Sequence, residues 1–129
     1  MKTKRVFDSF ALLAYLKREK GSDRIMGYLY SDEVIVNAVN LGEVFYILAR
    51  SHGIEKARYF VATILPSLPL ACVTNGCEDV LEAARIKAEY SLSYADCFAV
   101  ATALKEDAPV VTGDPEFKKI EEIIKVDWV

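Results

Sequence analysis

KRVFDSFALL, at residues 4–13, passes from a β-like run directly into a helical pattern. Residues 4–7 include a β-branched and an aromatic side chain, which are typical of a strand, and the pattern of residues 9–18 predicts a helix. Asp8 stands at the junction between the two. A strand that leads at once into a helix is typical of the crossover units that build a parallel sheet.

The same alternation continues along the chain. Leu41, Val44 and Leu48, for example, recur at helical spacing on one face, and Gly53 stops that helix. Shorter apolar runs between such segments read as strands. We predict strands at 4–7, 34–36, 70–73, 109–112 and 123–126, and helices at 9–18, 23–30, 41–48, 57–65, 77–84, 97–104 and 116–122.

Strands separated by crossover helices imply a parallel sheet with helices on both faces. We therefore predict one α/β domain over residues 1–129, a three-layer α/β/α sandwich around a four- or five-stranded parallel sheet. In such sheets, ligands bind beyond the carboxyl ends of the strands. The search for a functional site begins at that edge.

The composition excludes several classes of protein. No apolar run approaches the roughly 20 residues of a membrane span, and the basic N-terminal residues are not followed by a signal-type apolar block. We expect a cytoplasmic protein without membrane contact. The net charge of −3 permits a nucleic-acid substrate but does not predict one.

Histidine and cysteine offer little catalytic chemistry. The single histidine, His52, lies at a predicted helix end, where a structural role is expected. Cys72, Cys77 and Cys97 lack the spacing of a zinc site or disulfide scaffold, and we expect them to be small buried apolar residues. The chain has no nucleophile elbow, Walker loop or GxGxxG motif, so serine hydrolases and nucleotide-cofactor enzymes are unsupported.

Four acids, by contrast, stand where apolar segments end. Asp8 and Asp114 follow predicted strands, and Glu43 and Asp96 are expected in the first turns of helices. All four are therefore expected at one edge of the sheet, where carboxylates repel one another unless a cation lies among them. Carboxylate oxygens suit Mg²⁺ or Mn²⁺, and such an ion can activate water and stabilise charge on a phosphoryl oxygen.

Helix capping is the competing interpretation of these acids. Asn40 and Ser93 each precede an acid by three residues, which is the spacing of a capping box, and the two strand-end acids could be N-caps. If Asn40 and Ser93 supply the caps, however, Glu43 and Asp96 remain free to point elsewhere. Capping and metal binding can then coexist.

Four motifs, taken in order, resemble those of the PIN domain family. They are VFDSFALL at residues 6–13, NLGEV at 40–44, LSYADCFAVA at 92–101 and VTGDPEF at 111–117. The SYAD and TGD forms and the short length are most similar to VapC-type ribonuclease toxins. The resemblance implies a five-stranded sheet, a Mg²⁺- or Mn²⁺-dependent endoribonuclease, a homodimer and often an antitoxin partner that blocks the site. One departure is Asn40, where the family commonly has serine or threonine.

The resemblance also implies that Asp8, Glu43, Asp96 and Asp114 are the catalytic acids. We expect Asp8, Asp96 and Asp114 to bind the metal directly or through water. Glu43 would orient or deprotonate the attacking water, and hydrolysis would leave a 5′-phosphate and a 3′-hydroxyl. Glu116 could be an auxiliary acid or a solvated residue of a helix first turn.

Hydroxyl and basic side chains near the acids are further candidates. Ser9 and Thr112 could hydrogen-bond the site or the scissile phosphate, or only the local turns. Lys118 and Lys119 could reach an RNA backbone or form a solvated helix face. Arg50, two turns beyond the acid of the second motif, could pair with a phosphate or with another carboxylate.

Three other functions remain open at this point. A catalytically silent PIN-like module would bind RNA or protein, and a PIN nuclease can process RNA without being a toxin. A phosphatase using Asp8 as nucleophile is disfavoured, because Phe10 stands where dehalogenase-type phosphatases have the second aspartate of DxDxT. The leading hypothesis is a metal-dependent ribonuclease that acts as the toxin of a toxin–antitoxin pair.

Overall fold

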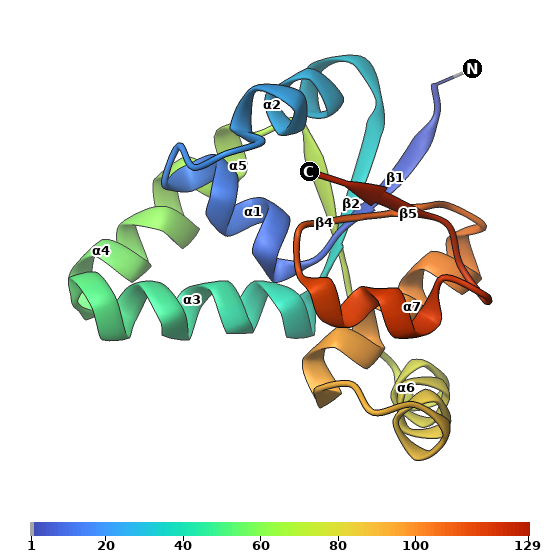
Figure 1. Cartoon of the computed structure of the whole chain (residues 1–129). Coiled ribbons are helices and arrows are strands. Elements are labelled where there is room, and N and C mark those ends of the chain that lie inside the picture. Colours follow the sequence, from blue (N-terminus) through green and yellow to red (C-terminus); the bar gives the residue numbers. More distant parts are fainter. Residues whose placement is uncertain (1) are drawn as a thin grey trace.

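A five-stranded parallel sheet forms the centre of the molecule (Figure 1), in a computed structural model that describes residues 2–129. The strand order is β3-β2-β1-β4-β5, so the first strand of the chain is central. This confirms the predicted parallel sheet and sets its strand number at five. The strands are β1 (Lys4–Phe7), β2 (Glu33–Asn37), β3 (Leu70–Val73), β4 (Val110–Thr112) and β5 (Val126–Trp128).

The helical segments that connect these strands occupy the predicted regions, although several boundaries differ. They are α1 (Ser9–Leu16), α2 (Ser22–Ser31), α3 (Ala38–His52), α4 (Ile54–Tyr59), the π-helical η1 (Phe60–Ile64), α5 (Leu65–Ser67), α6 (Cys77–Glu89), α7 (Tyr94–Glu106) and the 3-10 helix η2 (Pro115–Ile120).

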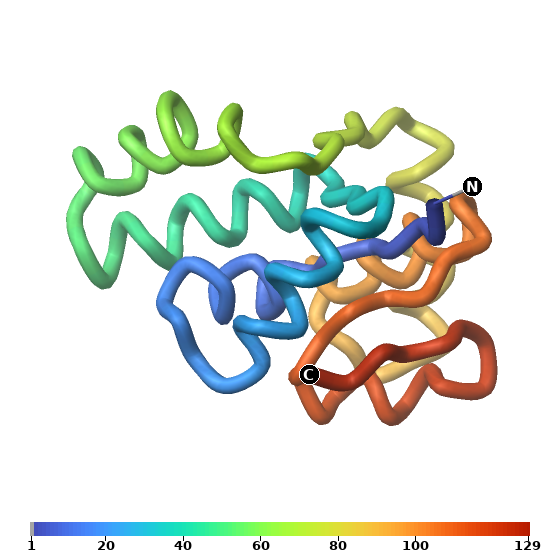
Figure 2. Tube along the Cα trace, turned by 90° about the horizontal axis from the view of Figure 1, so that it is seen from above, coloured from blue at the N-terminus to red at the C-terminus, as the bar shows by residue number. Residues whose placement is uncertain are grey.

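Helices cover both faces of the sheet, which confirms the three-layer α/β/α architecture. In β1, Val6 and Phe7 point to opposite faces, and both are fully buried. Val6 packs in a core shared with α6 and α7, and Phe7 in one shared with α1 and α2. Figure 2 shows α3 and α4 running side by side away from the sheet. Leu12 of α1, Val44 of α3 and Phe60 of η1 share a buried cluster.

The start of α3 corrects one expectation. Asn37, not Asn40, caps the helix, because the Asn37 Oδ1 accepts a hydrogen bond from the Asn40 amide at 2.9 Å. The apolar periodicity begins only at Leu41 and therefore misses the first turn. Glu43 consequently lies in the second turn of α3 rather than the first.

The segment predicted as one helix at 57–65 is α4 followed by η1 and α5. Pro66 lies in the first turn of α5 and has no N–H to donate to the preceding turn, which accounts for a change of helical hydrogen bonding here.

The C-terminal elements differ from the prediction for a local reason. The amides of Ile123 and Ile124 both donate to the Ile120 carbonyl, at 3.0 and 3.2 Å, so the chain turns where a strand is expected. The strand β5 begins only at Val126, which pairs with Val110.

Two of the three cysteines are also exposed rather than buried. Cys97 is buried as expected, whereas Cys72 lies on the edge strand β3 and Cys77 is the first residue of α6. Within residues 2–129, no helix has the length and apolar character that crossing a membrane requires.

The sheet topology places the carboxyl ends of its central strands at the predicted site. β1 and β4 are neighbours, with Phe7 opposite Val111, so Asp8 and the turn after Thr112 leave the sheet side by side. The first turns of α3 and α7 are joined by a hydrogen bond from the Asn40 side chain to the Ala95 carbonyl and lie at the same edge.

Candidate active site

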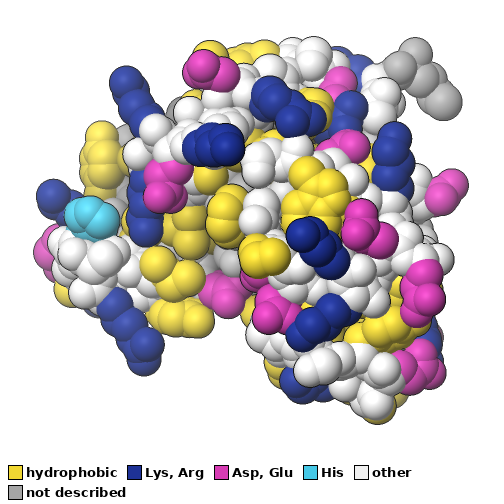
Figure 3. All heavy atoms as spheres, in the orientation of Figure 1, with side chains coloured by type: hydrophobic (Ala, Val, Ile, Leu, Met, Phe, Trp, Pro, Cys, Tyr) yellow, Lys and Arg dark blue, Asp and Glu magenta, His cyan; other side chains and the backbone are white. Residues whose placement is uncertain are grey.

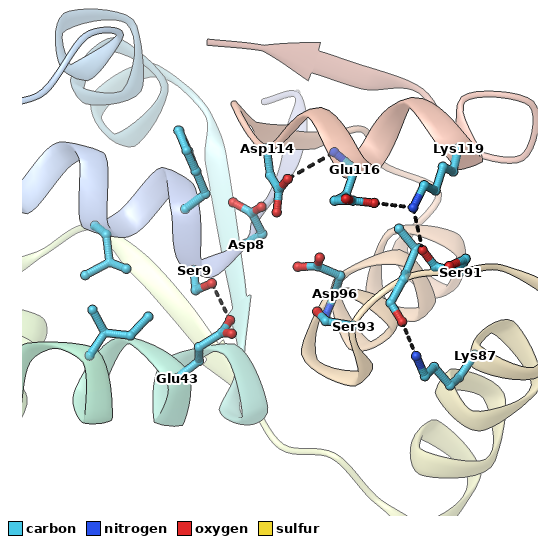
Figure 4. Close-up of a pocket in the computed structure, with 14 residues that line it drawn as sticks. Asp8, Ser9, Glu43, Lys87, Ser91, Ser93, Asp96, Asp114, Glu116 and Lys119 are labelled. Carbon is cyan, nitrogen blue, oxygen red and sulfur yellow. Dashed lines mark hydrogen bonds and ion pairs between the residues drawn. The ribbon is translucent and has the colours of Figure 1, made fainter. Parts of the chain in front are cut away.

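The four acids line one open cleft of about 570 Å³ at this edge (Figure 4). Asp8 comes from the β1–α1 junction, Glu43 from α3, Asp96 from the first turn of α7, and Asp114 from the turn before η2. Figure 3 shows acidic side chains gathered where the surface is hollowed between α3 and the lobe that holds α6 and α7. The predicted convergence is therefore present.

Asp8 both caps α1 and lines the cleft. Its Oδ1 accepts a hydrogen bond from the Ala11 amide at 2.8 Å, and its Oδ2 accepts one from the Thr112 hydroxyl at 2.5 Å. Only 1% of the residue is exposed. Burial raises the pKa of Asp8 to about 7, with smaller contributions from the charges of Asp96 and Asp114, and the two hydrogen bonds act in the opposite direction.

Asp96 lies in a similar environment across the cleft. Ser93 caps α7 as predicted, because its hydroxyl accepts a hydrogen bond from the Asp96 amide at 3.2 Å. Burial raises the pKa of the Asp96 carboxyl to about 6, followed by repulsion from Asp114, Glu43 and Glu116. The charges of the other acids thus act on the carboxyls of Asp8 and Asp96, which places the four acids close together.

Glu43 reaches the cleft from α3 and is held by a hydroxyl. The Ser9 Oγ donates a hydrogen bond to the Glu43 Oε1, which links the first turn of α1 to the second turn of α3 (Figure 4). Glu43 is half-buried, and its backbone lies inside the helix rather than at its end. Its placement owes nothing to capping.

Thr112 connects two of the acids. Its buried hydroxyl donates to Asp8 and accepts a hydrogen bond from the Asp114 amide at 3.0 Å. Asp114 in turn accepts a hydrogen bond from the Glu116 amide at 3.0 Å and caps η2. The capping interpretation thus holds for Asp8 and Asp114, and both still face the cleft.

Two predicted substrate contacts lie elsewhere. Arg50 is exposed on α3, with its guanidinium carbon 5.3 Å from the centre of the Tyr46 ring, and does not line the cleft. Lys118 is exposed on η2 and does not line it either, whereas its neighbour Lys119 does. The short 3-10 helix turns these adjacent residues in different directions.

Lys87 and Phe10 are cleft residues that sequence reasoning missed. Lys87 comes from α6, whose place beside α7 follows from packing and not from a motif. Phe10 follows Asp8 by two residues and is 40% exposed, which is high for a phenylalanine in an apolar helix. Of these two residues, only Phe10 could have been expected in the cleft from the sequence, because it lies two residues after Asp8.

The donor set is chemically suited to a hard divalent cation. All four acids offer oxygen, and a cation would offset the burial and repulsion that raise the pKa values of Asp8 and Asp96. Among residues 2–129, no three Asp, Glu, His or Cys side chains are arranged to hold one ion. Because Mg²⁺ usually binds one or two carboxylates and keeps several waters, Asp8, Asp96 and Asp114 suit a hydrated ion rather than a cage of protein ligands.

Comparison with known proteins identifies the relatives of this arrangement. The model of the PIN domain family matches residues 5–123. No curated protein matches the chain in sequence.

Solved structures of toxin–antitoxin proteins share the fold. VapBC2 from Rickettsia felis, bound to a DNA fragment from its promoter, superposes with a TM-score of 0.76 at 16% identity, covering 98% of this chain and 100% of the other. DNA-bound VapBC from Salmonella typhimurium gives 0.73 at 16% identity, with 97% of each chain covered. Mycobacterium tuberculosis VapC20, a toxin that cleaves the sarcin–ricin loop, gives 0.71 at 16% identity, with 88% and 92% covered.

Proposed function

The chain belongs to the PIN domain family, and from this we propose that it is a metal-dependent endoribonuclease and the toxin of a toxin–antitoxin pair. The observation that carries the proposal is the meeting of Asp8, Glu43, Asp96 and Asp114 in one cleft. We further propose that it acts in the cytoplasm. The fold it shares with VapC20 and with the VapBC complexes supports both the reaction and the partner.

Asp8, Asp96 and Asp114 would hold a Mg²⁺ or Mn²⁺ ion, partly through water. A bound divalent ion lowers the pKa of water and stabilises negative charge on phosphoryl oxygens. The chain itself contributes the positions of these acids. Thr112 ties Asp8 to the Asp114 backbone, and Ser93 fixes the first turn that carries Asp96.

Glu43 is the proposed base. Held by the Ser9 hydroxyl and free of any capping role, its carboxylate would orient the attacking water and accept its proton. Hydrolysis of the phosphodiester would leave a 5′-phosphate and a 3′-hydroxyl. Asp8 is a poor candidate for a covalent nucleophile, because both its oxygens already accept hydrogen bonds and burial favours its protonated form.

Asp96→Asn tests the proposal directly. We expect cleavage of cellular RNA in the presence of Mn²⁺ to fall by at least roughly 100-fold while the fold is retained, as removal of a transition-state charge contact does. Asp107→Asn is the matched control, because it makes the same change at the other end of α7, in a left-handed conformation that asparagine tolerates. Wild-type cleavage by Asp96→Asn would remove this residue from the mechanism.

Metal binding separates an enzyme from a silent module. Calorimetry should detect Mn²⁺ binding by the wild-type protein, and chelation should stop RNA cleavage. A protein that binds no Mn²⁺ at millimolar concentration and cleaves no RNA would be a silent PIN module. A nuclease whose expression leaves cell growth unchanged would be an RNA-processing enzyme rather than a toxin.

We also propose a homodimer and an antitoxin partner. Large apolar side chains are exposed along α3, α4 and η1, which favours a protein contact over free solvent. Light scattering during gel filtration should give twice the monomer mass of 14.4 kDa. A monomer at all concentrations would contradict the dimer. The exposed apolar residues of α3, α4 and η1 that would form the contact are Tyr46, Ile54, Tyr59 and Val61.

A further inference from the structure

Two lysines from distant parts of the chain lie on one wall of the acidic cleft. Lys87 comes from α6 and Lys119 from η2, and Figure 4 shows both on the side away from α3. Of the described residues that line the cleft, only these two are basic, against five carboxylates that include Glu116. The proposed reaction assigns them no role.

Each of the two ammonium groups is held by a backbone carbonyl of the same short segment. The Lys87 Nζ donates to the Leu92 carbonyl at 2.5 Å, and the Lys119 Nζ donates to the Ser91 carbonyl at 2.8 Å. Ser91 and Leu92 are consecutive residues in the link between α6 and α7. Lys119 also pairs with Glu116 on its own helix. The link thus holds two basic groups on one wall of the cleft.

Each lysine keeps hydrogen-bonding capacity for a ligand. An ammonium group has three N–H donors, and the contacts above use one on Lys87 and two on Lys119. Both side chains can therefore donate to a further acceptor without leaving the carbonyls that hold them.

An RNA strand needs positive charge at this wall. Five carboxylates repel the backbone phosphates, and a divalent ion among the aspartates acts mainly on the scissile phosphate. Phosphates on either side of it must be stabilised by other cations. Lysine offers a compact charge that binds phosphate without reading the bases.

We propose that Lys87 and Lys119 form a phosphate-binding subsite that holds the RNA backbone next to the scissile bond. The inference rests on the ribonuclease function proposed above and adds the residues that position its substrate. The competing role is purely structural, in which the lysines only fasten the link that leads into α7.

RNA binding and its salt dependence distinguish the two roles. Binding of a short fluorescent single-stranded RNA is measured in a Glu43→Gln background with Mg²⁺, which lacks the proposed base but keeps the aspartates. Lys87→Gln and Lys119→Gln should each weaken binding roughly three- to tenfold, uniformly across sequences, and each should reduce the log–log salt slope by about 0.7. Lys87→Arg and Lys119→Arg should keep most of the affinity and the slope.

Lys17→Gln and Lys56→Gln, each made singly, are the matched controls for net charge. Both residues are exposed and lie outside the cleft, so affinity should change little. An equal loss in these controls would overturn the subsite. Lower thermal stability of the Lys87→Gln and Lys119→Gln variants with an unchanged salt slope would also overturn it and favour the structural role. If Lys87→Gln does not fold, Lys119→Gln, whose side chain is 44% exposed, decides alone.

The control for the proposed function is cleavage by the wild-type protein. Cleaving wild type together with lysine variants that bind RNA normally would overturn only the subsite. A wild type that neither binds nor cleaves RNA would overturn the ribonuclease proposal and the subsite together.

Discussion

The position of Asp8 follows from the local sequence, whereas its pKa depends on residues that are distant in the sequence. Its place after a strand could be predicted from the sequence, because the apolar run ends there. Its pKa of about 7 could not, because burial by the surrounding helices and the charges of Asp96 and Asp114 depend on the completed fold. The same residue therefore carries a consequence for stability that the sequence does not reveal.

The metal-free protein should lose stability as the pH rises. The pKa of Asp8 is higher in the folded state than its ordinary value of 3.8, so the folded state binds the proton more tightly. The stabilisation is complete below about pH 4 and is lost as the pH rises through about 7, at about 1.4 kcal/mol per pKa unit. Urea unfolding in the presence of a chelator, from about pH 4 to about pH 8, measures the change.

Asp8→Asn isolates this contribution. The variant should have a flatter dependence of the free energy of unfolding on pH than the wild type. Asp107→Asn, which is outside the cleft, should retain the wild-type dependence. Parallel curves for wild type and Asp8→Asn would show that Asp8 does not titrate in this range.

The absence of a side chain at Gly113 lets the Phe10 ring lie close to the backbone beside the site. A Cβ atom there would lie 2.4 Å from the Phe10 Cε1 and 3.0 Å from the Val129 carbonyl oxygen. Gly113→Ala should therefore lower stability by about 1–3 kcal/mol through overpacking. Phe10→Ala should relieve part of this loss, which a double-mutant cycle measured by thermal unfolding can detect. Strictly additive effects would contradict the clash.

At the scale of elements, the sequence predicts regions better than boundaries. The sequence finds α7 and β4 because each contains an apolar run whose residues are nearly all buried. It misplaces the start of α3, because Asn37 is both the last residue of β2 and the helix cap, so no polar turn separates the two elements and Ala38 and Val39 continue the apolar run of the strand. It also misses η1, since the spacing of apolar residues does not distinguish π-helical from α-helical hydrogen bonding.

A buried amide network joins the elements that carry two of the acids. The Asn40 Nδ2 donates to the Ala95 carbonyl at 3.0 Å, and its Oδ1 accepts from the Asn37 Nδ2 at 2.6 Å. The network thus connects α3, which holds Glu43, to α7, which holds Asp96. The family pattern marks Asn40 as a departure, and the structure gives it this buried connecting role.

Asn40→Ala should impair both stability and cleavage. Buried groups left without partners cost about 1–3 kcal/mol, and loosening the link between α3 and α7 should lower kcat/KM about tenfold or more. Thr102→Val is the matched control, because it removes another partner of Asn37 farther from the cleft. It should lower stability while kcat/KM stays near wild type. Equal activity in two equally destabilised variants would argue against a positioning role for Asn40.

At the scale of the whole molecule, the sheet order brings together what the sequence separates. The position of β1 between β2 and β4 places the acids of four motifs at one edge, and that could be predicted from the parallel topology. The basic wall could not. Lys87 and Lys119 lie on one wall because each donates to a carbonyl of the link into α7, and no motif or periodicity encodes those contacts.

Metal binding at this edge should stabilise the entire fold. The carboxylates repel one another in the folded protein but not in the unfolded chain, so an ion that binds only the folded state raises its stability by mass action. At a concentration of 100 times Kd the gain is about 2.7 kcal/mol. Because protons compete with the ion for Asp8 and Asp96, the increase in Tm with Mn²⁺ should be larger at about pH 8 than at about pH 6.

The Asp8→Asn/Asp96→Asn variant tests whether the effect comes from this cleft. It should be more stable than the wild type without metal at about pH 8, since two buried charges are gone, and Mn²⁺ should no longer raise its Tm. Asp107→Asn should respond to Mn²⁺ as the wild type does, because it leaves every cleft carboxylate in place. If Mn²⁺ raises the Tm of the double variant as much as that of the wild type, the ion binds outside the cleft, and the acids meet there for another reason.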